Sequence, residues 1–373
     1  MKKTIVILLA FFMGMESCET DFEVNAPWID ITVVYGLLNQ KENPHVIKIN
    51  KAFLGEADVN DMAQIRDSSE YGADEITVKI QRSLNGSSYI DYGNLARYEA
   101  SNKPAGTFYS PDHALYSFTD TLEPGYNYRL VITKTATGDQ VFAETRIIED
   151  KGFKFIPNSY WTADPTKVKV DFYKDGNYFT FNKAFWNTAV NGRRYQLTVR
   201  FHYTEINILT SQETPKSLDW VFPARTSADL DGGDEMGTEI DGEDFYKFIG
   251  SKLDPPPANI VRCIGRAAGL TNSAGQLDFI VDVAGEDFNT YLEVNEPSTG
   301  IVQERPEYTN VFDENGNEQV GFFSARYSIS TESRLLSTDG IAGTSVTELK
   351  TGQYTGDLGF VTNTDPDIST CPL

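Results

Sequence analysis

The sequence predicts an all-β fold, and three observations favour this class. Short runs of alternating apolar and polar residues recur along the chain of 373 residues, the pattern expected of strands with one buried face. Glycine, proline, asparagine and aspartate bound most of these runs, as turn residues do. No long segment repeats its apolar residues with the 3.6-residue period of a helix. Because a chain of this length exceeds one comfortable core, we expect two domains.

The first predicted domain spans residues 28–150. The turn Pro124-Gly125 leads into the strand "YNYRLVI", and "VFAETRII" follows as the closing strand. This succession resembles immunoglobulin-like and fibronectin-type sandwiches. The polar insertion 55–71 is expected to hold a short helix. The expected strands are 29–38, 45–50, 75–83, 126–132 and 141–148.

The second predicted domain spans residues 151–373 and is expected to be larger and less regular. Residues 218–243 are expected to form a long loop rich in aspartate and glycine. Helices are expected at 242–253, ahead of three prolines, and at 286–295. We therefore expect a β-sandwich or curled sheet with one or two packed helices. The expected strands are 167–173, 177–187, 193–206, 258–267, 275–284 and 320–330.

The N-terminal segment 1–17 has the form of a signal peptide. Two lysines precede the apolar run 5–13, which is too short to span a membrane because a spanning helix takes about 20 residues. Ser17 and Cys18 resemble the lipobox of bacterial lipoproteins, in which the cysteine is acylated and the chain is cut just before it. An ordinary signal peptide with a chance cysteine is the alternative. Acyl chains on Cys18 would anchor the protein, since each buried CH₂ contributes about 0.8 kcal/mol.

Residues 18–27 would then form an acylated cysteine and an acidic tether. The string Glu19, Thr20, Asp21, Phe22 and Glu23 resembles the export signal that Bacteroidota lipoproteins carry after the acylated cysteine. This resemblance implies transfer across the outer membrane to the cell surface. A solvated tether with no signal in it is the alternative.

Composition agrees with an exterior location. The formal net charge is −22, and it becomes −23 once residues 1–17 are removed. Such acidity favours solubility and argues against binding to nucleic acid or to anionic lipid headgroups. Besides Cys18, the chain holds Cys263 and Cys371, which could pair in an oxidising compartment. Two buried free thiols are the alternative.

The order of several segments resembles a large family of uncharacterised Bacteroidota outer-membrane lipoproteins. An N-terminal cysteine precedes an immunoglobulin-like module with a "VVYGLL" first strand, and "DFNTYLEVN", "PEYTNV" and "GFFSARYS" follow in order. Genes of that family commonly lie beside TonB-dependent receptors, so the resemblance implies a location and a neighbouring β-barrel but no reaction. The family often ends in a cysteine pair, whereas this chain has only Cys371 near its end. Cys263 is therefore the partner that this comparison suggests for Cys371.

Signatures of catalysis are absent from the sequence. The three histidines, His45, His113 and His202, stand in no metal-binding spacing. The chain has no G-x-S-x-G elbow, no phosphate-binding loop and no cysteine in a catalytic context. We therefore expect no enzymatic activity, with a hydrolase as the third-ranked hypothesis.

The Asp/Gly-rich segment is the candidate docking loop, and it is also the candidate calcium site. An EF-hand that starts at Asp229 would need glycine at its sixth position and glutamate at its twelfth, where the chain has Asp234 and Ile240. An irregular Ca²⁺ site and a solvated loop remain the alternatives. The acidic residues singled out are Asp229, Asp231, Asp234, Glu235 and Asp241.

Aromatic residues suggest the second binding hypothesis. Exposed rings could stack on sugars, although alternating aromatics in strands more often form the core. The residues concerned are Phe153, Tyr160, Trp161, Phe185, Trp186 and Trp220. Taken together, the sequence predicts a surface-exposed outer-membrane lipoprotein that serves a β-barrel complex, such as a TonB-dependent (SusC-like) transporter. Its principal rival is a lipoprotein that captures a glycan or peptide.

Overall fold

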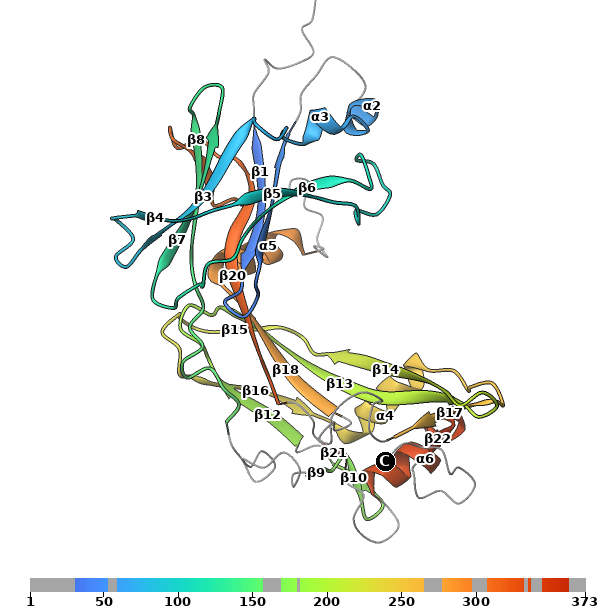
Figure 1. The fold of residues 1–373 in the computed structure, drawn as a ribbon. Helices are drawn as coiled ribbons and strands as arrows, with labels where there is room; N and C mark the ends of the chain where they lie inside the picture. Colours follow the sequence, from blue (N-terminus) through green and yellow to red (C-terminus); the bar gives the residue numbers. More distant parts are fainter. Residues whose placement is uncertain are drawn as a thin grey trace, which may run out of the picture.

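The computed structural model describes most of the chain between residues 31 and 361. About 46% of the described residues lie in strands and 14% in helices, which confirms the predicted all-β class. The chain forms two lobes, an upper and a lower one in the view of Figure 1. The described residues are 31–52, 59–156, 169–179, 182–264, 277–296, 307–331, 335–336 and 344–361.

The upper lobe is a β-sandwich of two antiparallel-rich layers. One layer holds β20 (Val320–Ser330), β1 (Thr32–Leu38), β2 (His45–Lys51), β6 (His113–Phe118) and β5 (Ala96–Ala100), in that order. The other holds β19 (Val311–Asp313), β8 (Gln140–Arg146), β7 (Asn127–Lys134), β3 (Ile76–Ser83) and β4 (Ile90–Asn94). Only Leu95 separates β4 from β5, so the chain passes from one layer to the other along a single edge.

Alternation along these strands builds the core between the layers. In β1, Val34 and Leu38 are fully buried, whereas Tyr35 between them points outward and is exposed. Gly36 of the same strand lies against Phe323 of β20, where the Cβ of any other residue would come within 2.8 Å of the ring. The close approach of these two strands therefore requires glycine at this position.

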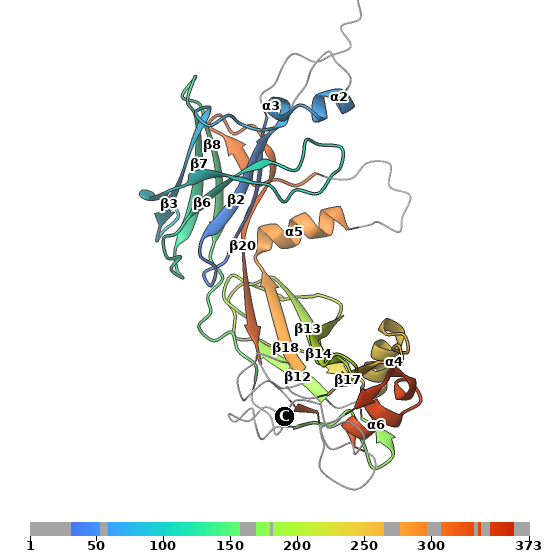
Figure 2. The same cartoon turned by 45° about the vertical axis from the view of Figure 1, so that its right-hand side comes forward.

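Strand β20 joins the two lobes. Its first half pairs in parallel with β1, and residues Arg326–Ser330 pair antiparallel with β18 (Leu277–Ala284) of the lower lobe. One long sheet therefore runs through both lobes (Figure 2). The predicted second domain also supplies β19, which pairs with β8. The sandwich is thus completed by a segment that lies far beyond residue 150, the predicted domain boundary.

The lower lobe is built on the long strand β13 (Arg194–Asn207), which pairs with β18 on one side and with β14 (Gln212–Val221) on the other. The rest of this sheet is β15 (Arg225–Thr226), β17 (Ile260–Cys263) and β22 (Phe360–Val361). Three short pairs complete the lobe: β12 (Asn182–Asn187) with β16 (Glu235–Ile240), β10 (Tyr173–Lys174) with β11 (Asn177–Tyr178), and β9 (Lys169–Val170) with β21 (Leu335–Leu336).

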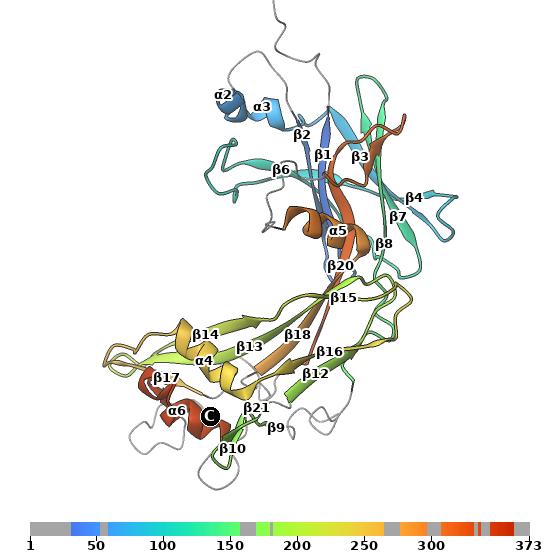
Figure 3. The same cartoon turned by 180° about the vertical axis from the view of Figure 1, so that it is seen from behind.

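Short helices cover parts of both lobes. Helix α4 (Gly242–Lys252) packs on the β13–β14 layer through Phe245, whose ring lies 5.8 Å from that of Phe201 (Figure 3). The side chain of Asp241 caps this helix by accepting the backbone N–H of Glu243 at 2.8 Å. The remaining helical segments are α2 (Val59–Ala63), α3 (Arg66–Ser69), α5 (Glu286–Asn295), α6 (Ser345–Thr351) and the 3₁₀ turn Gly356–Leu358.

The helices predicted within 55–71 and at 242–253 and 286–295 are confirmed, whereas the long loop predicted at 218–243 is wrong. Strand β14 continues to Val221, and β15 and β16 occupy much of the remainder. Strand β14 was hard to identify because it is an exposed edge strand that contains Pro215 and has no buried alternating face. Strand β16 contains Gly237, a residue that weakens the strand pattern in the sequence. Glycine is needed there because a Cβ would collide with the ring of Phe185.

Candidate functional site

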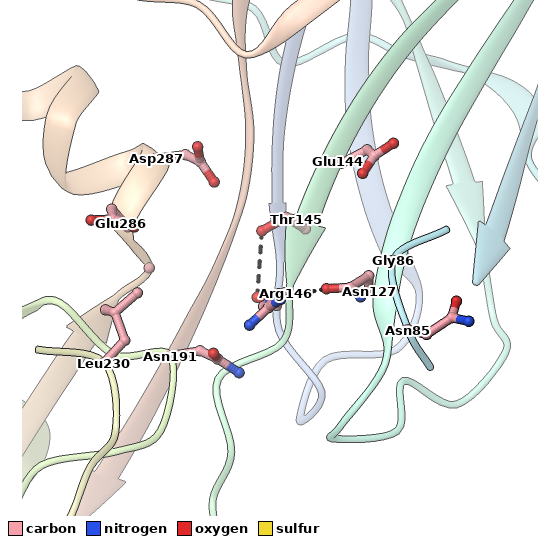
Figure 4. A pocket seen from close by; sticks show the side chains of 11 residues that line it. Asn85, Gly86, Asn127, Glu144, Thr145, Arg146, Asn191, Leu230, Glu286 and Asp287 are labelled. Carbon is pink, nitrogen blue, oxygen red and sulfur yellow. Dashed lines mark hydrogen bonds between the residues drawn. The ribbon is translucent and has the colours of Figure 1, made fainter. Parts of the chain in front are cut away.

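A polar cleft lies where the two lobes meet, and we call it the junction cleft. One part of it has a volume of about 500 Å³ and is lined by the β3–β4 turn, strands β7 and β8, two loops of the lower lobe and the start of α5 (Figure 4). An adjoining part of about 520 Å³ shares Glu144 and Asp287 with it. Clefts of this size at domain junctions are common ligand sites.

Local hydrogen bonds fix the walls of the junction cleft. On the upper wall, the Oδ1 of Asn85 accepts the backbone N–H groups of Ser87 and Ser88, both at 3.0 Å, and so shapes the β3–β4 turn. On the lower wall, Asn191 adopts a left-handed backbone with φ of 64° and donates its side-chain amide to the Ile147 carbonyl at 3.0 Å. This second bond ties a lower-lobe turn to the end of β8.

Helix α5 supplies the acidic wall. The helix lies beside β20 at the waist of the molecule (Figure 2), and the ring of Phe288 stacks on Phe322 at 5.2 Å. Its first turn carries Glu286 and Asp287, and both line the cleft. The start of the helix is fixed because the N–H of Gly285 donates to the carbonyl of Ala325 at 2.9 Å.

Asp287 is the most perturbed carboxyl group of the cleft. Burial raises its pKa, the negative charge of Glu286 adds to the rise, and a hydrogen bond from the Tyr308 hydroxyl at 2.7 Å opposes it. No ion pair joins Asp287 to any residue that the structure describes. Burial and the same hydrogen bond also raise the pKa of Tyr308.

The two arginines of the cleft differ in their interaction partners. Arg129 pairs with Glu144 at 2.6 Å, and Glu144 also accepts the Tyr89 hydroxyl at 2.7 Å. Burial, together with this hydrogen bond, raises the pKa of Tyr89 to about 12. Arg146 instead donates its Nε to the side-chain oxygen of Asn127 at 2.8 Å. Among the described residues it has no carboxylate partner.

A second candidate surface is the closed end of the β13–β14 hairpin, Ile208–Ser211, which we call the hairpin tip. The Oδ1 of Asn207 accepts the N–H of Leu209 at 3.0 Å, and the N–H of Ser211 donates to the Asn207 carbonyl at 2.7 Å. These bonds close the turn, in which Leu209 is 79% exposed and Ile208 beside it is 47% exposed. In Figure 1 the tip lies at the lower right, away from the upper lobe.

The acidic residues singled out in the sequence do not converge on one point. Asp241 caps α4, Glu235 begins β16, and the N–H of Asp234 donates to the Thr188 hydroxyl at 3.0 Å. Asp229 accepts the N–H of Asp231 at 3.0 Å in the loop that remains. Within the described ranges, no group of three or more His, Cys, Asp or Glu residues is placed to hold a metal ion.

The three histidines lie in separate places. His45 is buried, its Nε2 lies 3.1 Å from the Asp120 carbonyl oxygen, and burial lowers its pKa. Burial also lowers the pKa of His113 in β6. His202 lies 2.8 Å from Asp278 across the β13–β18 pair, so a histidine–carboxylate pair exists, but neither residue lines the junction cleft.

The aromatic residues that could have stacked on sugars lie mainly inside the lower lobe. Phe153 and Trp186 are buried, and Phe185 is half-buried. Trp220 packs against Phe248, with the ring centres 5.7 Å apart. Tyr160 and Trp161 lie outside the described residues. The expectation that these aromatics form core is therefore confirmed for Phe153 and Trp186.

The N-terminal and C-terminal predictions lie largely outside the described part of the chain. Cys18, the string 19–23 and Cys371 belong to undescribed segments. Cys263 is buried in β17 and is disulfide-bonded to a cysteine outside the described residues. The pairing of Cys263 with Cys371 stays a prediction.

Sequence reasoning did not single out the residues of the junction cleft. Glu286 and Asp287 stood in a predicted helix, but acidic residues in a first turn are usual because they complement the helix dipole. Arg146 lies within the predicted strand 141–148 and belongs to no motif. Only the packing of β8 and α5 against β20 brings these side chains to one cleft.

The fold and the site define a two-lobed, β-rich protein with a polar cleft at its waist. Comparison with family models gives no match, and no curated protein has a similar sequence. In the described segments, no helix is long and apolar enough to cross a membrane.

Proposed function

We propose that the protein is a surface-exposed lipoprotein of the outer membrane and a non-enzymatic accessory subunit of a β-barrel complex, specifically a TonB-dependent (SusC-like) transporter. The hairpin tip is the observation that carries this proposal. It projects Leu209 and Ile208 into solvent from a hydrogen-bonded turn, and two adjacent exposed apolar side chains can pack against a partner. The sequence resemblance to lipoproteins encoded beside TonB-dependent receptors supports the identity of the partner.

Docking through the tip is favoured over strand addition along β14. An open edge strand can recruit another strand, but Pro215 lacks the N–H that a continuous ladder needs. Charged residues, Lys216 and Asp219 among them, also occupy this edge, and such residues discourage pairing. The tip is free of both obstacles.

The proposed anchor is compatible with this orientation. Strand β1 begins at the top of the upper lobe in Figure 1, and the hairpin tip lies in the lower lobe. The segment from Cys18 to Thr32 could span at most about 45–50 Å when extended. A lipoprotein held by that tether would keep its lower lobe free to meet the extracellular loops of a barrel.

A pull-down with matched variants tests the proposal. The tagged protein, recovered from gently solubilised outer membranes, is expected to bring a stoichiometric β-barrel protein with it. Leu209→Asp should abolish this recovery, whereas Leu84→Asp, at a leucine that is 70% exposed in the upper lobe, should preserve it. Both variants should change the free energy of unfolding by no more than about 0.5 kcal/mol. Recovery of the lipoprotein alone would contradict the proposal.

Surface display requires its own measurement. Protease treatment of intact cells should cleave the protein, and cleavage should be lost when residues 19–23 are replaced by neutral residues. An intact protein on shaved wild-type cells would refute surface display while leaving the barrel partnership open to the pull-down.

The second candidate function is capture of a glycan or a peptide, and the junction cleft favours it. A hydrolase ranks third, since the His202–Asp278 pair lies on strands of the lower sheet and outside the cleft.

A further inference from the structure

We propose that the junction cleft binds short peptides through their two charged ends, with the α-carboxylate at Arg146 and the α-ammonium group at Glu286 and Asp287. This inference deepens the second candidate function and names its ligand class. It does not depend on docking to a barrel. Opposite charges held apart on facing walls of one cavity are the arrangement that complements a zwitterion (Figure 4).

Arg146 is the carboxylate-binding end. Its Nε is already oriented by Asn127, which leaves the two terminal nitrogens of the guanidinium for a ligand. A guanidinium held in this way matches the two oxygens of a carboxylate. The amide side chains of Asn85 and Asn191 line the same part of the cleft and can donate further hydrogen bonds.

Glu286 and Asp287 form the ammonium-binding end. Glu286 makes no side-chain hydrogen bond or ion pair within the described part of the chain. Asp287 is partly buried and makes no ion pair with any described residue, and its pKa is raised by this burial. A ligand ammonium group would give these carboxylates the ion pair that no described residue makes with them, and two carboxylates outweigh the opposing dipole of the helix start.

The remainder of the cleft suits a short peptide. The adjoining part of about 520 Å³ is lined by Phe142 and Phe312, neighbours across the β8–β19 pair, which offer an apolar face to side chains. Both parts together have room for a ligand of about two or three residues.

A neutral glycan fits this cleft less well than a peptide. It would leave Arg146 and Glu286 without countercharges. Among the described residues, the lining of the part of the cleft that holds them also has no aromatic side chain on which a sugar ring could stack.

Calorimetric titration of the purified mature protein tests this ligand class. The probe is trialanine with free ends, compared with its N-acetylated form, its C-amidated form and a neutral trisaccharide. We expect the free peptide to bind and each blocked form to bind at least about tenfold more weakly, because each loses one charge-assisted contact.

Variants locate the two ends. Arg146→Gln should weaken the free peptide but not the C-amidated one, and Glu286→Gln should weaken the free peptide but not the N-acetylated one. Arg225→Gln and Glu213→Gln are matched controls at exposed positions of the lower lobe and should bind as the wild type does.

Three results would overturn the inference. The first is equal binding of free and blocked peptides, and the second is unchanged binding in both cleft variants. The third is that no peptide binds, whether or not the trisaccharide does. The pull-down separates this outcome from failure of the main proposal, because Arg146→Gln leaves the hairpin tip intact and should still recover a barrel partner.

Discussion

Two carboxylates are shielded from water in different regions of the molecule, Glu70 in the upper lobe and Asp287 at the junction cleft. They differ in the charged groups that surround them. Glu70 follows α3 and lies under it, with 3% of its side chain exposed, 2.9 Å from Lys48 and 3.4 Å from Arg66. It also accepts the backbone N–H of Ala114 at 2.8 Å. Asp287 has a tyrosine hydroxyl but no cation among the described residues.

The pKa values of the two carboxyl groups record this difference. Burial alone would raise the pKa of Glu70, but the hydrogen bonds from Lys48 and Ala114 and the charges of Lys48 and Arg66 lower it overall. Burial raises the pKa of Asp287, and nothing nearby reverses the rise. Within the described part of the chain, Glu70 has two cations beside it and Asp287 pairs with none, and a buried carboxyl group with a perturbed pKa in a cleft is a candidate for a ligand site.

The largest expected effect is the loss of stability in Glu70→Gln. The amide keeps the shape but leaves Lys48 without a countercharge, and burial already lowers the pKa of Lys48 against the pull of Glu70. Breaking a buried pair in this way costs about 3–5 kcal/mol, and we expect the lower end of this range because 22% of the Lys48 side chain is exposed. Urea unfolding should show this loss, while the control Glu123→Gln, at an exposed pair with Arg82, should lose at most about 1 kcal/mol. Equal losses in the two variants would show that the buried Glu70 pair contributes no more to stability than an exposed ion pair.

A smaller effect is expected on the acid side of the stability curve. Because the pKa of folded Glu70 lies below its ordinary value of 4.5, its contribution is complete above that pH and is lost as the pH falls through the folded pKa. The difference in unfolding free energy between wild type and Glu70→Gln should therefore shrink below pH 4.5. A difference that stays constant down to pH 3 would refute the assignment of the lowered pKa to Glu70.

The sequence predicts individual strands better than it predicts how distant strands pair, and this limits what it reveals of the junction cleft. Alternation identified β1, β2, β3, β7 and β8, because each strand has one buried face that a local pattern reports. It did not reveal that β20 pairs with β1, since their sequence separation leaves no local signal. The junction cleft depends on that pairing, so Arg146 looked like one residue of an ordinary strand, and Glu286 and Asp287 looked like an ordinary helix start.

The smallest effect on stability is expected from Asp287→Asn. Asparagine can still accept the Tyr308 hydroxyl, and the variant removes a negative charge that burial makes costly, while it loses a favourable helix-dipole interaction of about 0.3–1 kcal/mol. We therefore expect the free energy of unfolding at pH 7 to stay within about 1 kcal/mol of the wild-type value or to rise slightly. Asp244→Asn, in the exposed first turn of α4, loses the dipole interaction and an exposed ion pair with Lys247 at 3.5 Å, and it should be slightly destabilised.

The pH dependence distinguishes this explanation of Asp287→Asn from a neutral surface change. In the wild type the cost of charging Asp287 is present at neutral pH, and it disappears as the pH falls through the raised pKa of the folded state. The wild type should therefore gain stability relative to Asp287→Asn in that range, the reverse of the trend for Glu70. A loss above about 1 kcal/mol at pH 7, or a trend with the same sign as that of Glu70, would mean that the fold uses Asp287 for its own stability. Such a result would contradict a role of the Asp287 carboxylate in ligand binding.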